Sequence, residues 1–311
     1  MQKPKVSVIC LCYNQALFVR ESLDSVMGQD YSDLEVIVVD DASTDGSAEV
    51  IQTFLKDYPE VPFLALKENV GNTTAFNRGL ALASGQYVID LACDDVMLSK
   101  RVSEQVAFWD RVSDRVGVVY SEAEYIDERG ELLSYHFADG KHEPYNGEVY
   151  ERLIDTYFIP PPTMMMRKDV LDELGGYDES LAYEDFDFWV RSARHWEYAY
   201  QPDMLTRIRR LKYSHSSGLY QPGDRQLQST VRICYKIAAM NISPEEDQAL
   251  VRRIQYEVRH AFLMGHREEV AQLMALMKTL RGNTWLYRVI SYLNWGWDLS
   301  IVRRLIHRFK Y

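Results

Sequence analysis

Close to its N-terminus the chain reads Val6-Ser7-Val8-Ile9-Cys10-Leu11-Cys12-Tyr13-Asn14, an apolar, β-branched run that stops at a polar pair. A continuous apolar run of this length predicts a strand that is buried on both faces, as in a parallel sheet. A second such run, Leu34–Val39, ends in Asp40-Asp41-Ala42-Ser43, and residues 17–26 between the two runs have helical spacing. This opening therefore predicts a strand, a helix and a second strand parallel to the first.

The same alternation continues to about residue 120. Further strands are predicted at 63–66, 87–91 and 116–120, and further helices at 48–58, 74–83 and 100–112. Strands that alternate with helices of this length predict an α/β fold with a Rossmann-like, doubly wound and mostly parallel sheet. In such a sheet the ligands bind at the carboxyl ends of the strands.

Beyond residue 121 the pattern changes. The expected elements are a hairpin at 125–133, a strand at 163–167, helices at 169–174 and 183–196, and an extended segment at 198–211. From Arg225 the spacing is helical to the end of the chain. We therefore expect a sheet-bearing domain over 1–224 and a helical C-terminal region over 225–311.

Composition limits the class of protein. The 311 residues are 47% hydrophobic and 26% charged, which is ordinary for a soluble globular protein. We find no secretory signal and no uninterrupted apolar stretch of about 18 residues, so we expect no transmembrane helix and a cytoplasmic location. The four cysteines form no disulfide framework. A net charge of −11 argues against nucleic-acid binding, although residues 281–311 carry six Arg or Lys and one acid.

Three acidic pairs lie where this architecture places its ligands. Asp40-Asp41 ends the second strand, Asp94-Asp95 follows the strand at 87–91, and Glu184-Asp185 opens a helix. Acids at single strand ends are often turn residues or helix caps. Three pairs at one edge of one sheet favour a binding site.

These acids suit the chemistry of a nucleotide-sugar transferase. Asp94-Asp95 offers the hard oxygen ligands that Mg²⁺ or Mn²⁺ needs to neutralise a leaving diphosphate. Asp185 lies on a different segment and is available to take a proton from an acceptor hydroxyl. Asp41 could read a uracil N–H, and Tyr13 could stack on the base. Three arginines of the extended segment could bind phosphate: Arg207, Arg209 and Arg210. Because alternate residues of a strand point to opposite faces, not all three can do so.

The ordered set of motifs resembles the family 2 glycosyltransferases. The resemblance covers roughly residues 5 to 217. The matching segments are 6–14, 38–47, Asn69-Val70-Gly71, Asn77-Arg78-Gly79, 83–87, Cys93-Asp94-Asp95, 175–179 and 184–191. Two positions depart from the family pattern. Leu11-Cys12 replaces the more common Pro or Thr-Ser before Tyr13, and Phe76 replaces an Arg that many members carry.

The resemblance implies a GT-A fold in the catalytic domain and inversion at the anomeric carbon. It also implies a role for each matched position. The donor side would comprise Leu11, Tyr13, Asp41, Asn77 and Asp94; the divalent cation, Mn²⁺ or Mg²⁺, would be bound by Asp95 and His215; Asp185 would be the base; and Glu184 and Tyr177 would lie on the acceptor side. A surface histidine without a role is the alternative for His215.

The function expected is transfer from a nucleotide-diphosphate sugar, a UDP-sugar before others, to a glycan or glycolipid acceptor in surface polysaccharide or glycolipid synthesis. The alternatives are an inactive nucleotide-sugar-binding scaffold subunit and a sugar nucleotidyltransferase. The latter would need a Gly-rich basic loop where Tyr13-Asn14-Gln15-Ala16 stands. A dehydrogenase is excluded because no GxGxxG is present. The basic region 281–311 could contact the inner face of a membrane, pair two subunits or cover the catalytic domain.

Overall fold

The computed structural model describes residues 3–211, 225–282 and 285–296, and only the main chain of 286, 291 and 293–296. The described chain forms two compact units. The first comprises the described residues of 1–149, 158–180 and 187–211, and the second comprises 150–157, 181–186 and the described residues from 225 onward. Two short segments that precede residue 224 therefore belong to the helical unit.

A nine-stranded sheet forms the centre of the first unit, in the order β3-β2-β1-β4-β8-β6-β9-β5, with β7 paired to β6. The strands are β1 Val6–Cys12, β2 Leu34–Asp40, β3 Phe63–Ala65, β4 Tyr87–Ala92, β5 Val96–Met97, β6 Val116–Ile126, β7 Leu132–Tyr135, β8 Met165–Arg167 and β9 Glu197–Arg209. The first four strands in this order are parallel, as are β6 and β9. By contrast, β5, β7 and β8 run antiparallel to their neighbours. The predicted α/β architecture with a mostly parallel sheet is confirmed.

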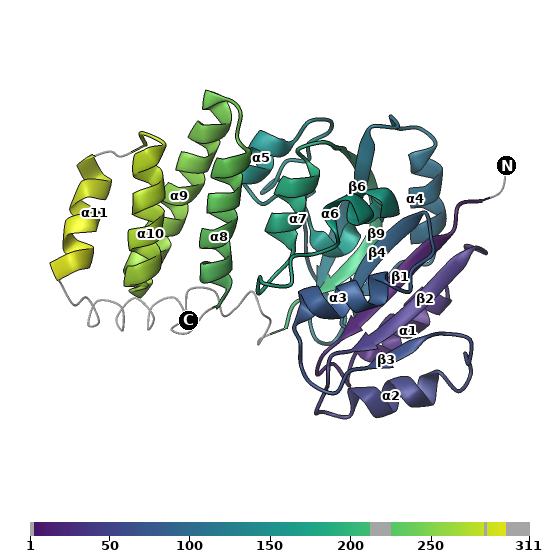
Figure 1. Cartoon of the computed structure of the whole chain (residues 1–311). Coiled ribbons are helices and arrows are strands. Elements are labelled where there is room, and N and C mark those ends of the chain that lie inside the picture. Colours follow the sequence, from purple (N-terminus) through teal and green to yellow (C-terminus); the bar gives the residue numbers. More distant parts are fainter. Residues whose placement is uncertain (1–2, 212–224, 283–284, 297–311) are drawn as a thin grey trace. The chain divides into compact units, whose positions relative to one another are not determined.

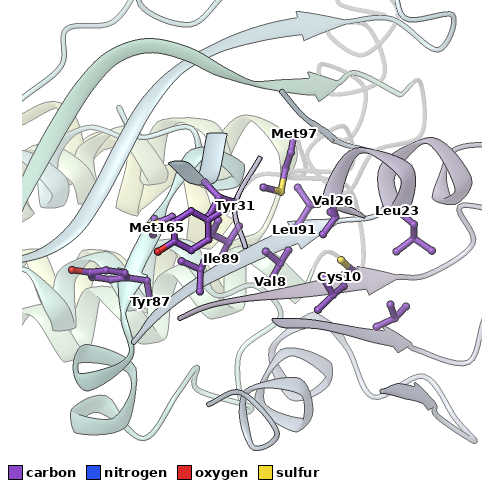
Figure 2. Packing of buried hydrophobic residues seen from close by; sticks show 14 of the residues in the cluster. Val8, Cys10, Leu23, Val26, Tyr31, Tyr87, Ile89, Leu91, Met97 and Met165 are labelled. Carbon is purple, nitrogen blue, oxygen red and sulfur yellow. The ribbon is translucent and has the colours of Figure 1, made fainter. Parts of the chain in front are cut away.

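Helices cover both faces of this sheet. They are α1 Val19–Met27, α2 Ser47–Phe54, α3 Asn72–Leu80, α4 Arg101–Trp109, the 3₁₀ helix η1 Pro161–Thr163, α6 Lys168–Leu174, and α7 Asp185–Ser192, whose first two residues belong to the second unit. Val8 and Cys10 of β1 pack in one core with Leu23 of α1 (Figure 2). Ile9 points to the other face, where a Cβ on Gly79 of α3 would lie 2.6 Å from its Cγ2 atom. Only glycine allows α3 to approach the sheet so closely.

The second unit is helical. Its helices are α5 Tyr150–Asp155, α8 Arg225–Met240, α9 Pro244–Met264, α10 Arg267–Thr279 and α11 Trp285–Gly296 (Figure 1). The Ser243 side chain accepts a hydrogen bond from Glu246 N and caps α9, and Gly265 ends it at φ 83°. The predicted C-terminal helices are thus confirmed within the described part of the chain. In that part, no helix has the length and apolarity to cross a membrane. All four cysteines are buried and free.

Candidate active site

The loops after β1 and β2 are joined by side-chain hydrogen bonds. Asn14, at φ 55°, donates its backbone N–H to Ser43 Oγ over 2.9 Å, and its Oδ1 accepts from Thr44 N over 2.8 Å. Asparagine tolerates this left-handed conformation better than most residues. The pair of loops leaves the Tyr13 side chain 41% exposed at the carboxyl edge of the sheet. The predicted base-stacking residue is therefore accessible.

Asp41 organises the loop that precedes α3. Its carboxylate is buried, and its two oxygens accept hydrogen bonds from Val70 N at 2.8 Å and Gly71 N at 2.9 Å. Each carboxylate oxygen has a second lone pair, which is the acceptor that a nucleobase N–H would use. A direct contact between Asp41 and the base stays a prediction. Its observed partners make it a positioning residue as well.

Asn77 and Tyr177, predicted on the donor and acceptor sides, bind each other. The Asn77 amide accepts from Tyr177 N at 2.9 Å and donates to Tyr177 O at 2.8 Å. The buried Tyr177 ring stacks on Phe76, with centroids 4.2 Å apart. The departure at Phe76 therefore provides a packing surface for Tyr177. Leu11 is also buried, in β1, so of the predicted donor residues Tyr13 is the more open.

Arg209 anchors the acidic pair at the end of β4. Its backbone N–H donates to Asp95 Oδ1 at 2.8 Å, and its Nε donates to the Asp94 carbonyl at 2.9 Å. The guanidinium also pairs with Glu21 at 2.7 Å and lies 4.7 Å from the centroid of the Phe18 ring. The sequence placed Arg209 only among three arginines that could meet phosphate. Its structural role was missed because all of these partners are distant in sequence.

The two acids fit a divalent cation that is shared with a substrate. Asp95 is buried and Asp94 half-buried. Burial and, next, the Asp94 carboxylate hold the pKa of Asp95 well above its ordinary value. A bound cation would stabilise the ionised form of both carboxylates. No group of three His, Cys, Asp or Glu side chains in the described residues is arranged to hold a metal. Mg²⁺, however, is usually bound by one or two carboxylates with substrate phosphates. His215, the other predicted ligand, lies outside the described residues.

Glu184 and Asp185 belong to the second unit, and α7 begins at Asp185. Both side chains are half-buried. The segment that carries them is attached to α8 by two hydrogen bonds. Ala182 N donates to Ser229 Oγ at 2.8 Å, and the Tyr183 hydroxyl bonds Thr230 Oγ1 at 2.8 Å. The predicted base thus lies on a segment that the C-terminal helices hold.

A buried arginine of α9 completes this attachment. The Arg253 guanidinium lies 4.0 Å from the centroid of the Tyr157 ring and 5.2 Å from that of Phe186, the residue after Asp185. It also pairs with Glu257 at 3.3 Å and donates to the Ile154 carbonyl at 3.0 Å. The sequence analysis missed this residue, because the Tyr157 and Phe186 rings come from segments about 70 to 100 residues earlier and no local spacing indicates the contact.

Comparison with known proteins identifies the family. Residues 7–175, more than half of the chain, match the sequence model of Glycosyl transferase family 2. The chain belongs to this family. An uncharacterized glycosyltransferase of Methanocaldococcus jannaschii is 29% identical over 195 residues, and one of Rickettsia typhi is 28% identical over 192 residues. Each match covers 61% of this family 2 glycosyltransferase, and 65% and 59% of the respective relatives.

Solved structures extend the likeness of this family 2 glycosyltransferase to nearly the whole chain. S. aureus TarS 1–349 in complex with UDP-GlcNAc has a TM-score of 0.69 at 19% identity, over 99% of this chain and 93% of TarS. The mannosyltransferase PcManGT from Pyrobaculum calidifontis, in complex with GDP-Man and Mn²⁺, has a TM-score of 0.61 at 18% identity, over 98% and 87% of the two chains. These likenesses show the GT-A fold. The predictions of family and fold are thus confirmed, and the role of each site residue stays a prediction.

Proposed function

We propose that this family 2 glycosyltransferase transfers a sugar from UDP to a hydroxyl group of a glycan or glycolipid, with inversion, in the synthesis of a surface polysaccharide or glycolipid. The observation that carries the proposal is the Asp94-Asp95 pair, which Arg209 holds at the carboxyl end of β4. Ligands of open α/β sheets bind at this edge. Solved structures with the same fold contain UDP-GlcNAc or GDP-Man, which supports a nucleotide-sugar donor.

In the proposed donor site, Tyr13 stacks on the nucleobase, because its ring is partly exposed beside the joined loops. Asp41 binds the base and at the same time holds the 70–71 loop. Leu11 and Asn77 shape this side of the site from β1 and α3. Asp94 and Asp95 would hold Mn²⁺ or Mg²⁺, whose charge stabilises the leaving diphosphate when the cation is bound.

On the acceptor side we assign proton transfer to Asp185. A carboxylate that accepts the hydroxyl proton makes the oxygen a better nucleophile, and the oxygen attacks the anomeric carbon on the face opposite the diphosphate. The proton ends on Asp185 and the bond to the diphosphate breaks. Glu184, the neighbouring acid, would contact the acceptor, and Tyr177, which is buried against Phe76, would support the acceptor side from within. His215 remains a proposed ligand of the cation or diphosphate.

A thermal-shift panel tests the donor class. The protein is heated with UDP, GDP, CDP or dTDP, each with Mn²⁺ and with EDTA. A ligand at about 100 times its dissociation constant stabilises a protein by about 2.7 kcal/mol. We expect the largest shift with UDP and Mn²⁺, and its loss in Asp94→Asn. A well-folded protein that shifts with no diphosphate would contradict the proposal.

We also propose that the region 281–311 contacts the inner face of an anionic membrane. Trp285, Val289 and Tyr292 of α11 are 74%, 43% and 71% exposed, and their spacing places them on one helix face. The excess of basic residues in 281–311 would add attraction to anionic lipids. Salt-sensitive binding to phosphatidylserine vesicles, lost on deletion of 281–311, is expected. A concentration-dependent dimer lost on the same deletion, without vesicle binding, would assign the region to a homodimer contact instead.

A further inference from the structure

A cavity of about 230 Å³ lies in the first unit between the β6–β7 hairpin and the end of β9. Its walls include Tyr125, Tyr135, His136, Lys141, His142 and Arg210. The volume is below the roughly 300–1,000 Å³ of pockets for drug-sized ligands. The cavity therefore suits one chemical group or one sugar ring at the end of a larger molecule.

The cavity is positively charged although the chain carries a net charge of −11. Lys141 and Arg210 are fixed cations in its lining, and no Asp or Glu belongs to that lining. The Arg210 guanidinium lies 4.0 Å from the centroid of the Tyr125 ring, so it is held over an aromatic face. Both residues are exposed at the surface and open to a ligand.

Two carboxylates of the segments that form the cavity, Glu122 and Asp139, have other partners. Glu122 is buried and accepts from the backbone N–H groups of Ala123 at 2.8 Å, His136 at 3.0 Å, Phe137 at 2.9 Å and Ala138 at 2.8 Å. Asp139 accepts from Tyr135 N at 3.3 Å. Glu122 thus stabilises the loop that forms one wall of the cavity, and its charge is compensated by these N–H groups.

Two stacked histidines give the cavity a rigid wall. The rings of His136 and His142 are 4.6 Å apart and 6° from parallel. The Tyr125 hydroxyl and His136 Nδ1 are 2.6 Å apart, and His136 Nε2 lies 2.8 Å from the Phe158 carbonyl. Because a carbonyl only accepts, Nε2 carries a proton, and in the neutral ring Nδ1 accepts from the Tyr125 hydroxyl. Burial lowers the pKa of His136 and so favours the neutral ring, and Lys141 and Arg210 supply the charge of the cavity.

We propose that this cavity binds an anionic group, a phosphate or a carboxylate, of the acceptor sugar. The inference rests on the proposed transferase function. Tyr125 of the lining lies near enough to Asp95 for that carboxylate to help raise the pKa of the Tyr125 hydroxyl, after the larger effect of burial, so the cavity lies near the residues assigned to the donor diphosphate. Arg210 and Lys141 bind the anion, and Tyr135 in the lining supplies a ring on which a sugar can pack. The cavity would thus select charged glycans over neutral ones.

Titration calorimetry with small probes tests the cavity. Glucose 6-phosphate, glucuronate and glucose are titrated into the full chain at saturating UDP and Mn²⁺, so that the donor site is filled. The binding of UDP itself is measured separately on the same samples, which distinguishes failure of the donor proposal from failure of the cavity. We expect glucose 6-phosphate or glucuronate to bind at least about ten times more tightly than glucose, the scale of one charged hydrogen bond. The tighter of the two identifies the anion.

Variants locate the binding. Lys141→Gln and Arg210→Gln change exposed positions. Each substitution should weaken the binding of the anionic probe by about tenfold, while the affinity for UDP stays constant. Arg129→Gln, on the turn of the same hairpin but outside the cavity lining, is the matched control and should change neither. Equal affinity for the three probes, or an equal loss in Arg129→Gln, would overturn the proposal.

Discussion

The backbone N–H of Arg209 donates a 2.8 Å hydrogen bond to the Asp95 carboxylate, across 114 positions of sequence. The same residue donates from its guanidinium to the Asp94 carbonyl at 2.9 Å. One arginine at the end of β9 therefore fixes both the main chain and the buried acid of the proposed cation site. The site depends on this arginine as well as on the acids themselves.

Replacing Arg209 should disturb this site. In Arg209→Gln the carbonyls that the buried guanidinium satisfies lose their donor, so we expect the free energy of unfolding to fall by about 1.5–3 kcal/mol. UDP binding should also need a higher Mn²⁺ concentration. Urea unfolding and a Mn²⁺ titration measure the two effects. Arg207→Gln, on the same strand with a half-exposed ion pair to Glu124, is the control and should change stability by less than about 1 kcal/mol. Equal effects of the two substitutions would contradict the role given to Arg209.

The two adjacent glycines after α6 should differ in their tolerance of alanine. Both have positive φ, 70° at Gly175 and 78° at Gly176, so alanine strains the backbone at either position by about 1 kcal/mol or more. A Cβ at Gly176 would also lie 2.4 Å from Asn77 Oδ1, whereas a Cβ at Gly175 meets nothing within 4 Å. Gly176→Ala should therefore be the more destabilising, because it displaces the amide that holds Tyr177. Thermal unfolding of the two variants measures the difference, and equal melting temperatures would show that the Asn77 clamp is unimportant.

The sequence was sufficient to predict the elements of the parallel half of the sheet. The run predicted at Val6–Cys12 is the whole of β1, and the prediction for β2 was one residue short of Asp40. Burial on both faces leaves a continuous apolar signal in such strands. The prediction for β6 stopped at Tyr120, whereas the strand continues to Ile126. Glu122 hid the continuation, because its carboxylate is buried and accepts from the backbone N–H of Ala123 and from three backbone N–H groups 14 to 16 residues further along the chain.

Arg253 should link the C-terminal helices to the segment of the predicted base. Arg253→Met leaves the buried Glu257 carboxylate without its partner, so we expect a loss of about 3–5 kcal/mol in unfolding free energy. Its neighbour Arg252 forms half-exposed ion pairs with Asp155 and Glu151, and Arg252→Met should lose less than about 1 kcal/mol. Chemical denaturation compares the pair. If Arg253→Met still folds, its kcat should fall by a larger factor than its affinity for UDP. An unchanged kcat and an unchanged affinity for UDP would contradict the positioning role.

His136 predicts a pH dependence of stability. Burial lowers its pKa below the ordinary value of about 6.5, against the opposing effect of its bond to the Phe158 carbonyl. Between the ordinary and the lowered pKa, the unfolded chain binds more protons than the folded one, so the free energy of unfolding falls as pH decreases through this window. In His136→Gln this part of the loss should disappear. Urea unfolding at about pH 7 and about pH 5 compares His136→Gln with the unsubstituted protein. An equal loss of unfolding free energy on acidification in both proteins would exclude His136 as its source.

The candidate site was less predictable than the fold. The motifs identified the acids, because their types and positions follow from strand ends and from a family pattern. The side chains of the site are held by contacts between residues far apart in sequence, such as Asn77 with Tyr177 and Arg209 with Asp95. No spacing rule reports such pairs. The cavity beside Arg210 escaped notice for the same reason, since Lys141 comes from a loop nearly 70 residues earlier.

The measurement that tests the proposed function most directly is the rate at which Asp185→Asn releases UDP from a UDP-sugar in the presence of acceptor, relative to the unsubstituted protein. Asparagine keeps the size of the side chain but cannot accept the proton. We expect the rate to fall by at least about 100-fold, the lower range for a general base, while the affinity for UDP with Mn²⁺ is unchanged. Equal rates in the two proteins would contradict the assignment of Asp185, and the absence of turnover in the unsubstituted protein with every UDP-sugar and acceptor tried would contradict the proposal of a UDP-sugar transferase.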